Sequence, residues 1–331
     1  MTPRSQGPLA RLYGGFGLSG PVALLLALAA IAVPWLPGKF WTHVGTEVLI
    51  LGLFAMSFNL LYGYMGQISF GHAAFFGVGA YATAMLFTAL KDADGQIGVG
   101  AFLLSLVVGP PVAALAAIVV GFFCVRLTGI YFAILTLAFG ELLFYIVFSW
   151  YSFTKGDDGI QGLLPPPFFQ DPTNFYFFTL AIVVLALAAM WRITESPFGY
   201  AMRTLRDNQR RAAFLGTSVR AHMLANFVIA GTFAGLAGAL WGPFSRSVNP
   251  VLLGWGESGI AVFMTLIGGG GSFIGPMLGS VIYTMLQAVV KMYTVYWPLT
   301  IGIIILLIVL FAPGGILGLI DRRIRAARDR Q

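Results

Sequence analysis

Long runs of apolar residues dominate this sequence and limit what the chain can fold into. Ten such runs lie at 20–37, 44–62, 66–90, 98–124, 129–151, 174–192, 222–244, 258–270, 273–291 and 296–312. Charged residues make up 9% of the 331 and the mean hydropathy is +0.87, whereas ordinary soluble domains are about one quarter charged. In lipid, only helices or closed barrels satisfy the backbone, and these runs lack the alternation of barrel strands. The sequence therefore predicts an all-α fold, a polytopic transmembrane helix bundle of about 8–10 spans including broken or re-entrant helices.

Two of the runs differ from complete membrane-crossing helices. The run 258–270 is shorter than the roughly 20 residues that a helix needs to cross a hydrocarbon core, so we expect a half-helix or re-entrant segment there. The run 66–90 is interrupted by four glycines, at positions 66, 71, 77 and 79. We expect a broken helix in this second run.

The basic residues divide unequally between the two sides if all ten runs cross. One side collects fourteen of the nineteen lysines and arginines, including six arginines in the segment 192–220. The other side collects Lys39, Lys91, Lys155, Arg246 and Lys291. Because cytoplasmic loops carry excess positive charge, both termini are expected in the cytoplasm. The predicted division is a cytoplasmic tail at 1–19, a transmembrane domain at 20–312 and a basic cytoplasmic tail at 313–331.

The segment 192–220 is the one long polar interval between apolar runs. A Ser-Pro pair at 196–197 is a typical helix start, and Gly216 is expected to end that helix before a new cap at 217–218. The apolar residues of one face are Phe198, Ala201, Met202 and Leu205. The pattern predicts short helices on the cytoplasmic surface over 193–221, which either anchor the chain to anionic lipid or dock a partner.

Several chemistries lack the residues that they require. The phosphate-binding loop of ATPases ends in Gly-Lys-Ser/Thr, and the one lysine that follows a glycine, Lys39, is followed by Phe40. Cys124 is the only cysteine and the three histidines are far apart, so no metal site is expected. Ser69 and His72 could share a helix face, but no nearby carboxylate would orient the histidine as in a hydrolase. The chain is therefore not expected to be an enzyme or to hold a cofactor.

The glycine-rich segment 59–81 is the predicted substrate path. A broken helix exposes backbone N–H groups and the positive end of a half-helix dipole, which suit a substrate carboxylate. Close packing of small residues is the alternative. Glu141 lies inside an apolar run, as a path residue or a buried polar group, and Glu257 lies at the edge of a short one. The candidate path residues are Gly66, Gln67, Ser69, Gly71, His72 and Glu141.

The longest loop on the outer side, 151–174, is rich in glycine, proline and aspartate, which mark turns. Asp157 and Asp158 lie in it. They form either a solvated turn or a contact with an external partner.

Several blocks of this chain resemble the permease subunits of bacterial ABC importers for branched-chain amino acids, in particular the LivM-type subunit. The blocks are YGYMGQISFGHAAFFG at 62–77, RLTGIYFAILTLAF at 126–139, GDDGIQG at 156–162, RDNQRRAAFLG at 206–216, and 268–279 with FAPGG at 311–315. The resemblance extends over about 45–320. It implies that a paralogous permease, two ATP-binding subunits and a periplasmic binding protein work with this chain.

In such permeases a cytoplasmic E-A-A…G pattern seats in a cleft of the ATPase. Here Ala212, Ala213 and Gly216 resemble that pattern, with Arg211 in place of the acid and one residue less before the glycine. The coupling residues that the resemblance implies are Arg206, Asp207, Arg210, Arg211, Ala212, Ala213 and Gly216. The binding protein would dock near Asp157 and Asp158.

We therefore expect a multi-pass permease subunit of the bacterial inner membrane that translocates branched-chain amino acids, with ATP bound by the partner subunits and no nucleic acid among its partners. Urea or short amides are an alternative cargo for the same assembly. A secondary transporter or channel that works alone is the competing class of function.

Overall fold

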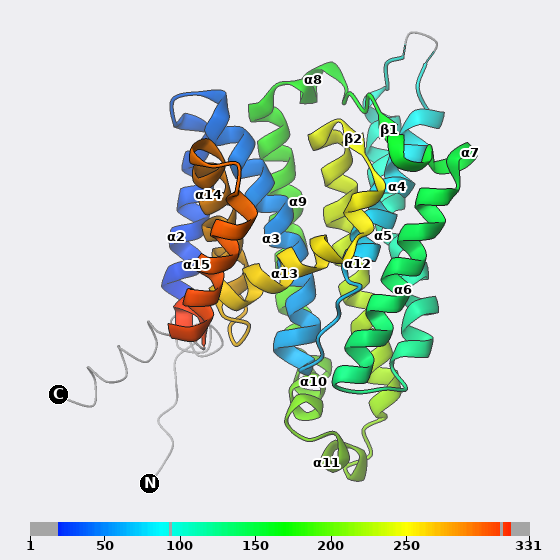
Figure 1. The fold of residues 1–331 in the computed structure, drawn as a ribbon, viewed down its shortest axis with the longest axis vertical. Helices are drawn as coiled ribbons and strands as arrows, with labels where there is room; N and C mark the ends of the chain where they lie inside the picture. The colour runs from blue at the N-terminus through cyan, green and yellow to red at the C-terminus, as the bar shows by residue number, and fades with distance from the viewer. Residues whose placement is uncertain (1–18, 93–94, 312–313, 319–331) are drawn as a thin grey trace, which may run out of the picture.

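The computed structural model describes residues 19–92, 95–311 and 314–318, which form a bundle of helices (Figure 1). The helices of the first half are α2 (Ser19–Ala32), α3 (Lys39–Met65), α4 (Ala73–Ala89), α5 (Val99–Cys124) and α6 (Ile130–Ser149). Short helices follow at α7 (Tyr151–Thr154) and α8 (Pro167–Gln170). The second half contains α9 (Pro172–Thr194), α10 (Pro197–Asp207), α11 (Gln209–Phe214), α12 (Val219–Ser245), α13 (Trp255–Gly268), α14 (Gly275–Tyr293) and α15 (Trp297–Phe311). The all-α prediction is confirmed.

Strand structure in the described part of the chain is limited to two short segments. β1 (Ile160–Gln161) pairs antiparallel with β2 (Ser247–Val248). Three 3-10 turns, η1 (Val33–Trp35), η2 (Gly156–Asp158) and η3 (Pro250–Leu253), complete the elements. The strand pair joins the loop 151–174 to the connection that follows α12.

The ten apolar runs each contain one helix of the described chain. Six helices are long and apolar enough to cross a membrane, among them α3, α5, α6, α9 and α12. The run predicted as a half-helix is α13, which has 14 residues. The run predicted as a broken helix begins with a non-helical segment at 66–72, and α4 follows it. Both of these predictions are confirmed.

The two short apolar helices α4 and α13 have comparable neighbours and begin from opposite sides of the bundle. α3 packs against α13 and α14, whereas α12 packs against α4 and α5. In Figure 1, α4 starts from a break on the side of α10, and α13 starts from the β2 side and crosses the bundle obliquely at mid-height. Transporter folds of this kind place their substrate sites near the bilayer midplane, where broken helices meet. A substrate site is therefore expected near the starts of α4 and α13.

Glycines bring α4 and α12 into backbone contact. A Cβ on Gly238 would collide with the carbonyl oxygen of Phe76 and lie 3.0 Å from the Ala80 nitrogen. Across the same interface, a Cβ on Gly79 would collide with the carbonyl oxygen of Gly235. Helices in a membrane associate mainly by such close packing of small residues, because lipid tails give no hydrophobic drive between apolar surfaces. The glycines of α12 therefore hold the core of the bundle together.

The basic residues of the described chain lie at the ends of the bundle, as the sequence count requires. Five basic residues border the end that carries α8, and they are Lys39, Lys91, Lys155, Arg246 and Lys291. The connection with Arg126 and the segment 192–220 lie at the opposite end. α2 starts and α15 ends on that same side (Figure 1). The tails predicted at 1–19 and 313–331 lie largely outside the described residues.

Candidate functional site

His72 is held in the core just before α4 begins. Its side chain is fully buried, its Nε2 lies 2.8 Å from the Ser57 hydroxyl oxygen, and its ring stacks on Phe54 at 5.5 Å between centroids. The edge of the ring meets Phe58. These contacts surround the imidazole with α3, so in this chain His72 packs the break between α3 and α4.

The other residues of the break also make internal contacts. The Gln67 side-chain oxygen accepts a hydrogen bond of 3.1 Å from the Gly129 N–H, at the start of α6. Ser69 is fully buried, and a Cβ on Gly71 would collide with the Thr136 carbonyl oxygen of α6. Gly66 ends α3 with a left-handed φ of 70°. These contacts are those of close packing; a role of these residues in the path stays a prediction.

The starts of the two half-helices meet inside the bundle. The Ala73 N–H, at the first residue of α4, donates a hydrogen bond of 2.9 Å to the Ser258 hydroxyl of α13. Ser258 is fully buried. An orphan N–H at a helix start must find an acceptor, and here α13 supplies it. α4 and α13 are therefore tied to each other at their N-terminal ends.

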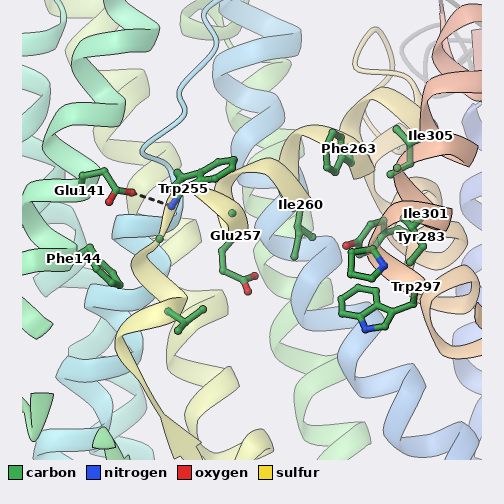
Figure 2. A pocket seen from close by; sticks show the side chains of 15 residues that line it. Glu141, Phe144, Trp255, Glu257, Ile260, Phe263, Tyr283, Trp297, Ile301 and Ile305 are labelled. Atoms are coloured by element: carbon green, nitrogen blue, oxygen red, sulfur yellow. Dashed lines mark hydrogen bonds between the residues drawn. The ribbon is translucent and has the colours of Figure 1, made fainter. Parts of the chain in front are cut away.

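A cavity of about 620 Å³ opens beside α13, between α6 on one side and α14 and α15 on the other (Figure 2). Its walls include Phe144 of α6, Ile260 and Phe263 of α13, and Ile301 and Ile305 of α15. Two carboxylates, those of Glu141 and Glu257, also line it. Small-molecule sites are typically apolar cavities of about 300–1,000 Å³ with a few polar groups. Of the predicted path residues, Glu141 lines this cavity.

The two carboxylates of the cavity have different surroundings. Glu141 Oε1 accepts a hydrogen bond of 3.2 Å from the Trp255 N–H at the first residue of α13, as the dashed line in Figure 2 marks. The carboxylate of Glu257, two residues further along α13, makes no hydrogen bond or ion pair with another described residue, although its backbone N–H donates to the Gly254 carbonyl oxygen. Glu47 of α3 and Lys291 of α14 are close enough to interact with it electrostatically. Glu257 is thus a carboxylate without a direct partner at membrane depth.

The polar segment at the other end of the bundle contains two helices. α10 starts at the predicted Ser-Pro pair, where the Ser196 hydroxyl accepts from the Gly199 N–H at 3.4 Å. The chain then breaks at Asn208, whose side chain caps α11 by accepting from the Arg211 N–H at 3.0 Å. The prediction of one helix that continues to Gly216 was therefore wrong, because the chain forms two helices on either side of Asn208. An Asn three residues before Arg211 is a typical N-cap, and this signal could have located the break.

Gly216 ends α11 as predicted. Its φ is +86°, a left-handed conformation that L side chains rarely adopt, and nothing lies within 4 Å of the position of a Cβ. The Gly216 N–H donates to the Ala213 carbonyl oxygen at 3.0 Å. Glycine is needed here because of its left-handed backbone conformation, since a side chain at this position would not collide with any neighbouring residue.

α10 is fixed to the end of α3 by two arginines. Arg206 donates a hydrogen bond to the Gly63 carbonyl oxygen in the last turn of α3. Arg203 forms an ion pair of 2.7 Å with Glu195 and lies over the Tyr64 ring at 5.2 Å. Displacement of α10 would therefore act directly on α3.

The predicted coupling residues are only partly available to a partner. Ala212 is fully buried and Arg206 is bonded to Gly63, whereas the remaining five are exposed: Asp207, Arg210, Arg211, Ala213 and Gly216. Sequence reasoning missed Phe214 and Leu215, which are 92% and 74% exposed. Two large apolar residues directly before the helix-ending glycine are the signal that could have identified them.

Asp157 and Asp158 form the 3-10 turn η2 at the end of the bundle with α8. Asp158 accepts a hydrogen bond of 3.1 Å from the Tyr151 hydroxyl, and this bond raises the pKa of the Tyr151 phenol. Both aspartates are exposed. Their docking to an external partner stays a prediction.

Comparison with known protein families finds one match over most of the chain. The family described as branched-chain amino acid transport system / permease component matches residues 42–312. No solved structure matches the chain significantly.

Three curated relatives carry more specific names. The high-affinity branched-chain amino acid transport system permease protein LivM of Escherichia coli K12 is 27% identical, over 88% of this chain and 74% of LivM. LivH of the same strain and the same named system is 26% identical, over 80% of this chain and 90% of LivH. The guanosine ABC transporter permease protein NupP of Bacillus subtilis 168 is 36% identical, over 35% of this chain and 34% of NupP.

Proposed function

Because this chain belongs to the family of branched-chain amino acid transport system permease components, we propose that it is the membrane-spanning subunit of an ATP-driven importer for branched-chain amino acids. It is a multi-pass membrane protein, and the relatives that match it are transport subunits. Since its sequence has no phosphate-binding loop, separate subunits bind and hydrolyse the ATP.

The observation that carries this proposal is the form of α11. A polar surface helix that exposes Phe214 and Leu215 beside Arg210 and Arg211 combines two large apolar side chains with a basic rim. Exposed apolar residues that cluster within polar surroundings are typical of docking sites. The ATP-binding subunit is the partner that an importer without its own ATP site requires, and α11 is where it docks.

Contacts within the chain supply a route from α11 to the cavity. α10 bonds to the last turn of α3 through Arg206, and in the turn before it Asn59 donates a hydrogen bond of 3.2 Å to the Ser272 carbonyl oxygen. Ser272 lies between α13 and α14, and α13 lines the cavity. Movement of α10 by the ATP-binding subunit would thereby shift α13 and change access to the cavity. Two-state movements of packed helices are a common form of such switching.

The distribution of positive charge orients the chain in the membrane. The end with α10 and α11 carries the arginine-rich segment and faces the cytoplasm, as do both termini. The end with α8 faces outward, where Asp157 and Asp158 are offered to the substrate-binding protein. The inner membrane of a bacterium is the location of such an assembly.

A second, paralogous permease completes the membrane part. Carboxylates at membrane depth are costly and face a bundle interior or a water-filled space rather than lipid. Since the cavity with Glu141 and Glu257 opens on the side of this single chain, the second permease covers that side, and the path runs between the two subunits.

Copurification tests this proposal. An affinity-tagged chain, expressed together with the candidate second permease and ATP-binding subunits of its own organism, should retain both partners in detergent. A variant with Asp92→Asn, in an exposed outer loop, is the matched control and should retain them equally. Isolation of the chain as a species that retains neither partner, and that drives uptake from an ion gradient, would favour the competing class of transporter that works alone.

A further inference from the structure

The cavity beside α13 carries more negative charge than its neighbours balance. Glu141 and Glu257 line it directly, and Glu47 acts electrostatically on Glu257 from α3. Among the described residues, Lys291 is the cation that acts on Glu257, and its ammonium lies over the Trp297 ring at 4.5 Å from the centroid. Among these groups three carboxylates face one cation. Glu141 and Glu257 are half-buried, and an unbalanced carboxylate that is partly removed from water is costly unless a cation comes to it.

The walls of the cavity suit a small cation with an apolar body. Figure 2 shows Glu257 on α13, with Glu141 and Phe144 of α6 on one side and Tyr283 and Trp297 on the other. Aromatic faces attract an ammonium group, and the Trp297 ring already carries that of Lys291. Ile260, Ile301 and Ile305, on the same side of Glu257 as Tyr283 and Trp297, form an aliphatic surface. The carboxylates and the aliphatic surface thus occupy different parts of one cavity. An aliphatic amino acid likewise has a charged ammonium group and an apolar side chain.

We propose that Glu257 binds the ammonium group of the transported amino acid in this cavity, with Glu141 on the opposite wall and the aliphatic side chain of the substrate against Ile260, Ile301 and Ile305. This subsite rests on the proposed importer function and names the part of the substrate that the membrane subunit recognises.

The subsite distinguishes amino acids from neutral cargoes. An ammonium group forms a charge-assisted hydrogen bond to the carboxylate and balances its charge. Urea, a short amide or guanosine brings no positive charge, so the half-buried Glu257 would stay without a counter-charge. Charge-assisted hydrogen bonds contribute on the order of a tenfold or greater difference in affinity. The membrane subunit would then add its own selection to that of the binding protein.

Protection from labelling tests ammonium binding directly, without the binding protein. Ile260→Cys places a thiol in the cavity wall, and the native Cys124 is fully buried, so wild-type assembly serves as the unlabelled control. The rate of labelling by a cationic methanethiosulfonate is measured on the complete permease and ATPase assembly. Leucine and leucinamide, which both carry the ammonium group, should protect at concentrations about tenfold or more below those of 4-methylpentanoate and urea.

Glu257→Gln in the same background should remove that advantage. Equal protection by leucine and 4-methylpentanoate would overturn the subsite, because it would leave only an apolar cavity. If none of the four compounds protects the thiol, in an assembly that takes up leucine with ATP, the subsite is also overturned, because the cavity then lies outside the path.

Uptake separates failure of the subsite from failure of the proposed function. With saturating binding protein, Glu257→Gln should lower leucine uptake about tenfold or more, Glu257→Asp should recover part of it, and Asp92→Asn should have no effect. Copurification of the ATP-binding subunits shows that each variant is folded. If wild-type assembly takes up leucine and Glu257→Gln does so equally, only the subsite fails. If wild-type assembly takes up no branched-chain amino acid, the proposed function itself fails.

Discussion

Replacing Phe214 and Leu215 together by serine is expected to abolish ATP-driven uptake while leaving the chain folded in the membrane. Both side chains are largely exposed at the end of α11, so serine removes no contact within the chain. Burial of a Phe or Leu side chain contributes about 1.5–3 kcal/mol, so losing two such anchors would weaken docking of the ATP-binding subunit by a factor on the order of a hundred or more. The measurements are leucine uptake and copurification of the ATP-binding subunit.

Leu185→Ser is the matched control for this variant. Leu185 is exposed at the surface of α9, so the control also replaces an exposed apolar side chain by serine, but away from α11. It should leave both readouts unchanged. Full uptake by the Phe214→Ser, Leu215→Ser variant would show that the ATP-binding subunit docks elsewhere, since no other part of the proposal depends on these two residues.

Gly238→Leu is expected to prevent folding of the bundle. Even a Cβ at this position collides with the backbone of Phe76, and backbone cannot move aside as a flexible side chain can. Separation of α12 from α4 would break a close backbone contact in the core of the bundle and cost more than about 4 kcal/mol, an effect of exceptional size for one substitution. The folded yield in detergent and the thermal stability of the purified chain measure this effect.

Gly100→Leu gives the comparison for that change. Gly100 lies in the first turn of α5, and nothing lies within 4 Å of the position of a Cβ there. The same substitution should therefore leave yield and stability close to wild type. A Gly238→Leu chain as stable as the Gly100→Leu chain would mean that α4 and α12 do not pack as closely as the structure has them.

Much of the fold could be predicted because it follows from local pattern. The lengths of the apolar runs located the helices, and the short run at 258–270 indicated the half-helix α13. Ser196 and Gly216 marked helix ends, because capping depends on a few neighbouring residues. The break at Asn208 was missed because Gly216 was the first residue expected to end the helix, and periodicity cannot detect a short interruption by a capping side chain.

The candidate site could be predicted only in part because it is tertiary. Glu141 and Glu257 come from helices more than a hundred residues apart, and only the oblique course of α13 brings them to one cavity. The segment around Gly71 is predicted as a substrate path because its glycines break a helix and expose backbone N–H groups beside polar side chains. In the fold, His72 Nε2 lies within hydrogen-bond distance of the Ser57 hydroxyl, and the Gln67 oxygen accepts from the Gly129 N–H. The Ser69 hydroxyl and His72 Nδ1 are buried without a hydrogen-bond partner among the described residues. A sequence alone does not distinguish a polar group that is satisfied within the chain from one that awaits a ligand.

The exposed apolar pair at 214–215 illustrates a different limit. Within a short helix, periodicity assigns apolar residues to a buried face by default. On α10 this holds, since Met202 and Leu205 are buried. On α11 it fails, because the helix projects beyond the bundle and leaves Phe214 and Leu215 without a surface to cover. Residues that a partner buries therefore appear as core residues until the rest of the chain is placed.

Uptake of labelled leucine into proteoliposomes tests the central claim most directly. The vesicles contain this chain alone or the complete assembly with its binding protein, and are energised either by ATP or by an ion gradient. The account predicts uptake only by the complete assembly and only with hydrolysable ATP, competed by isoleucine and valine but not by urea or guanosine. Uptake driven by an ion gradient in vesicles that contain this chain alone would contradict it.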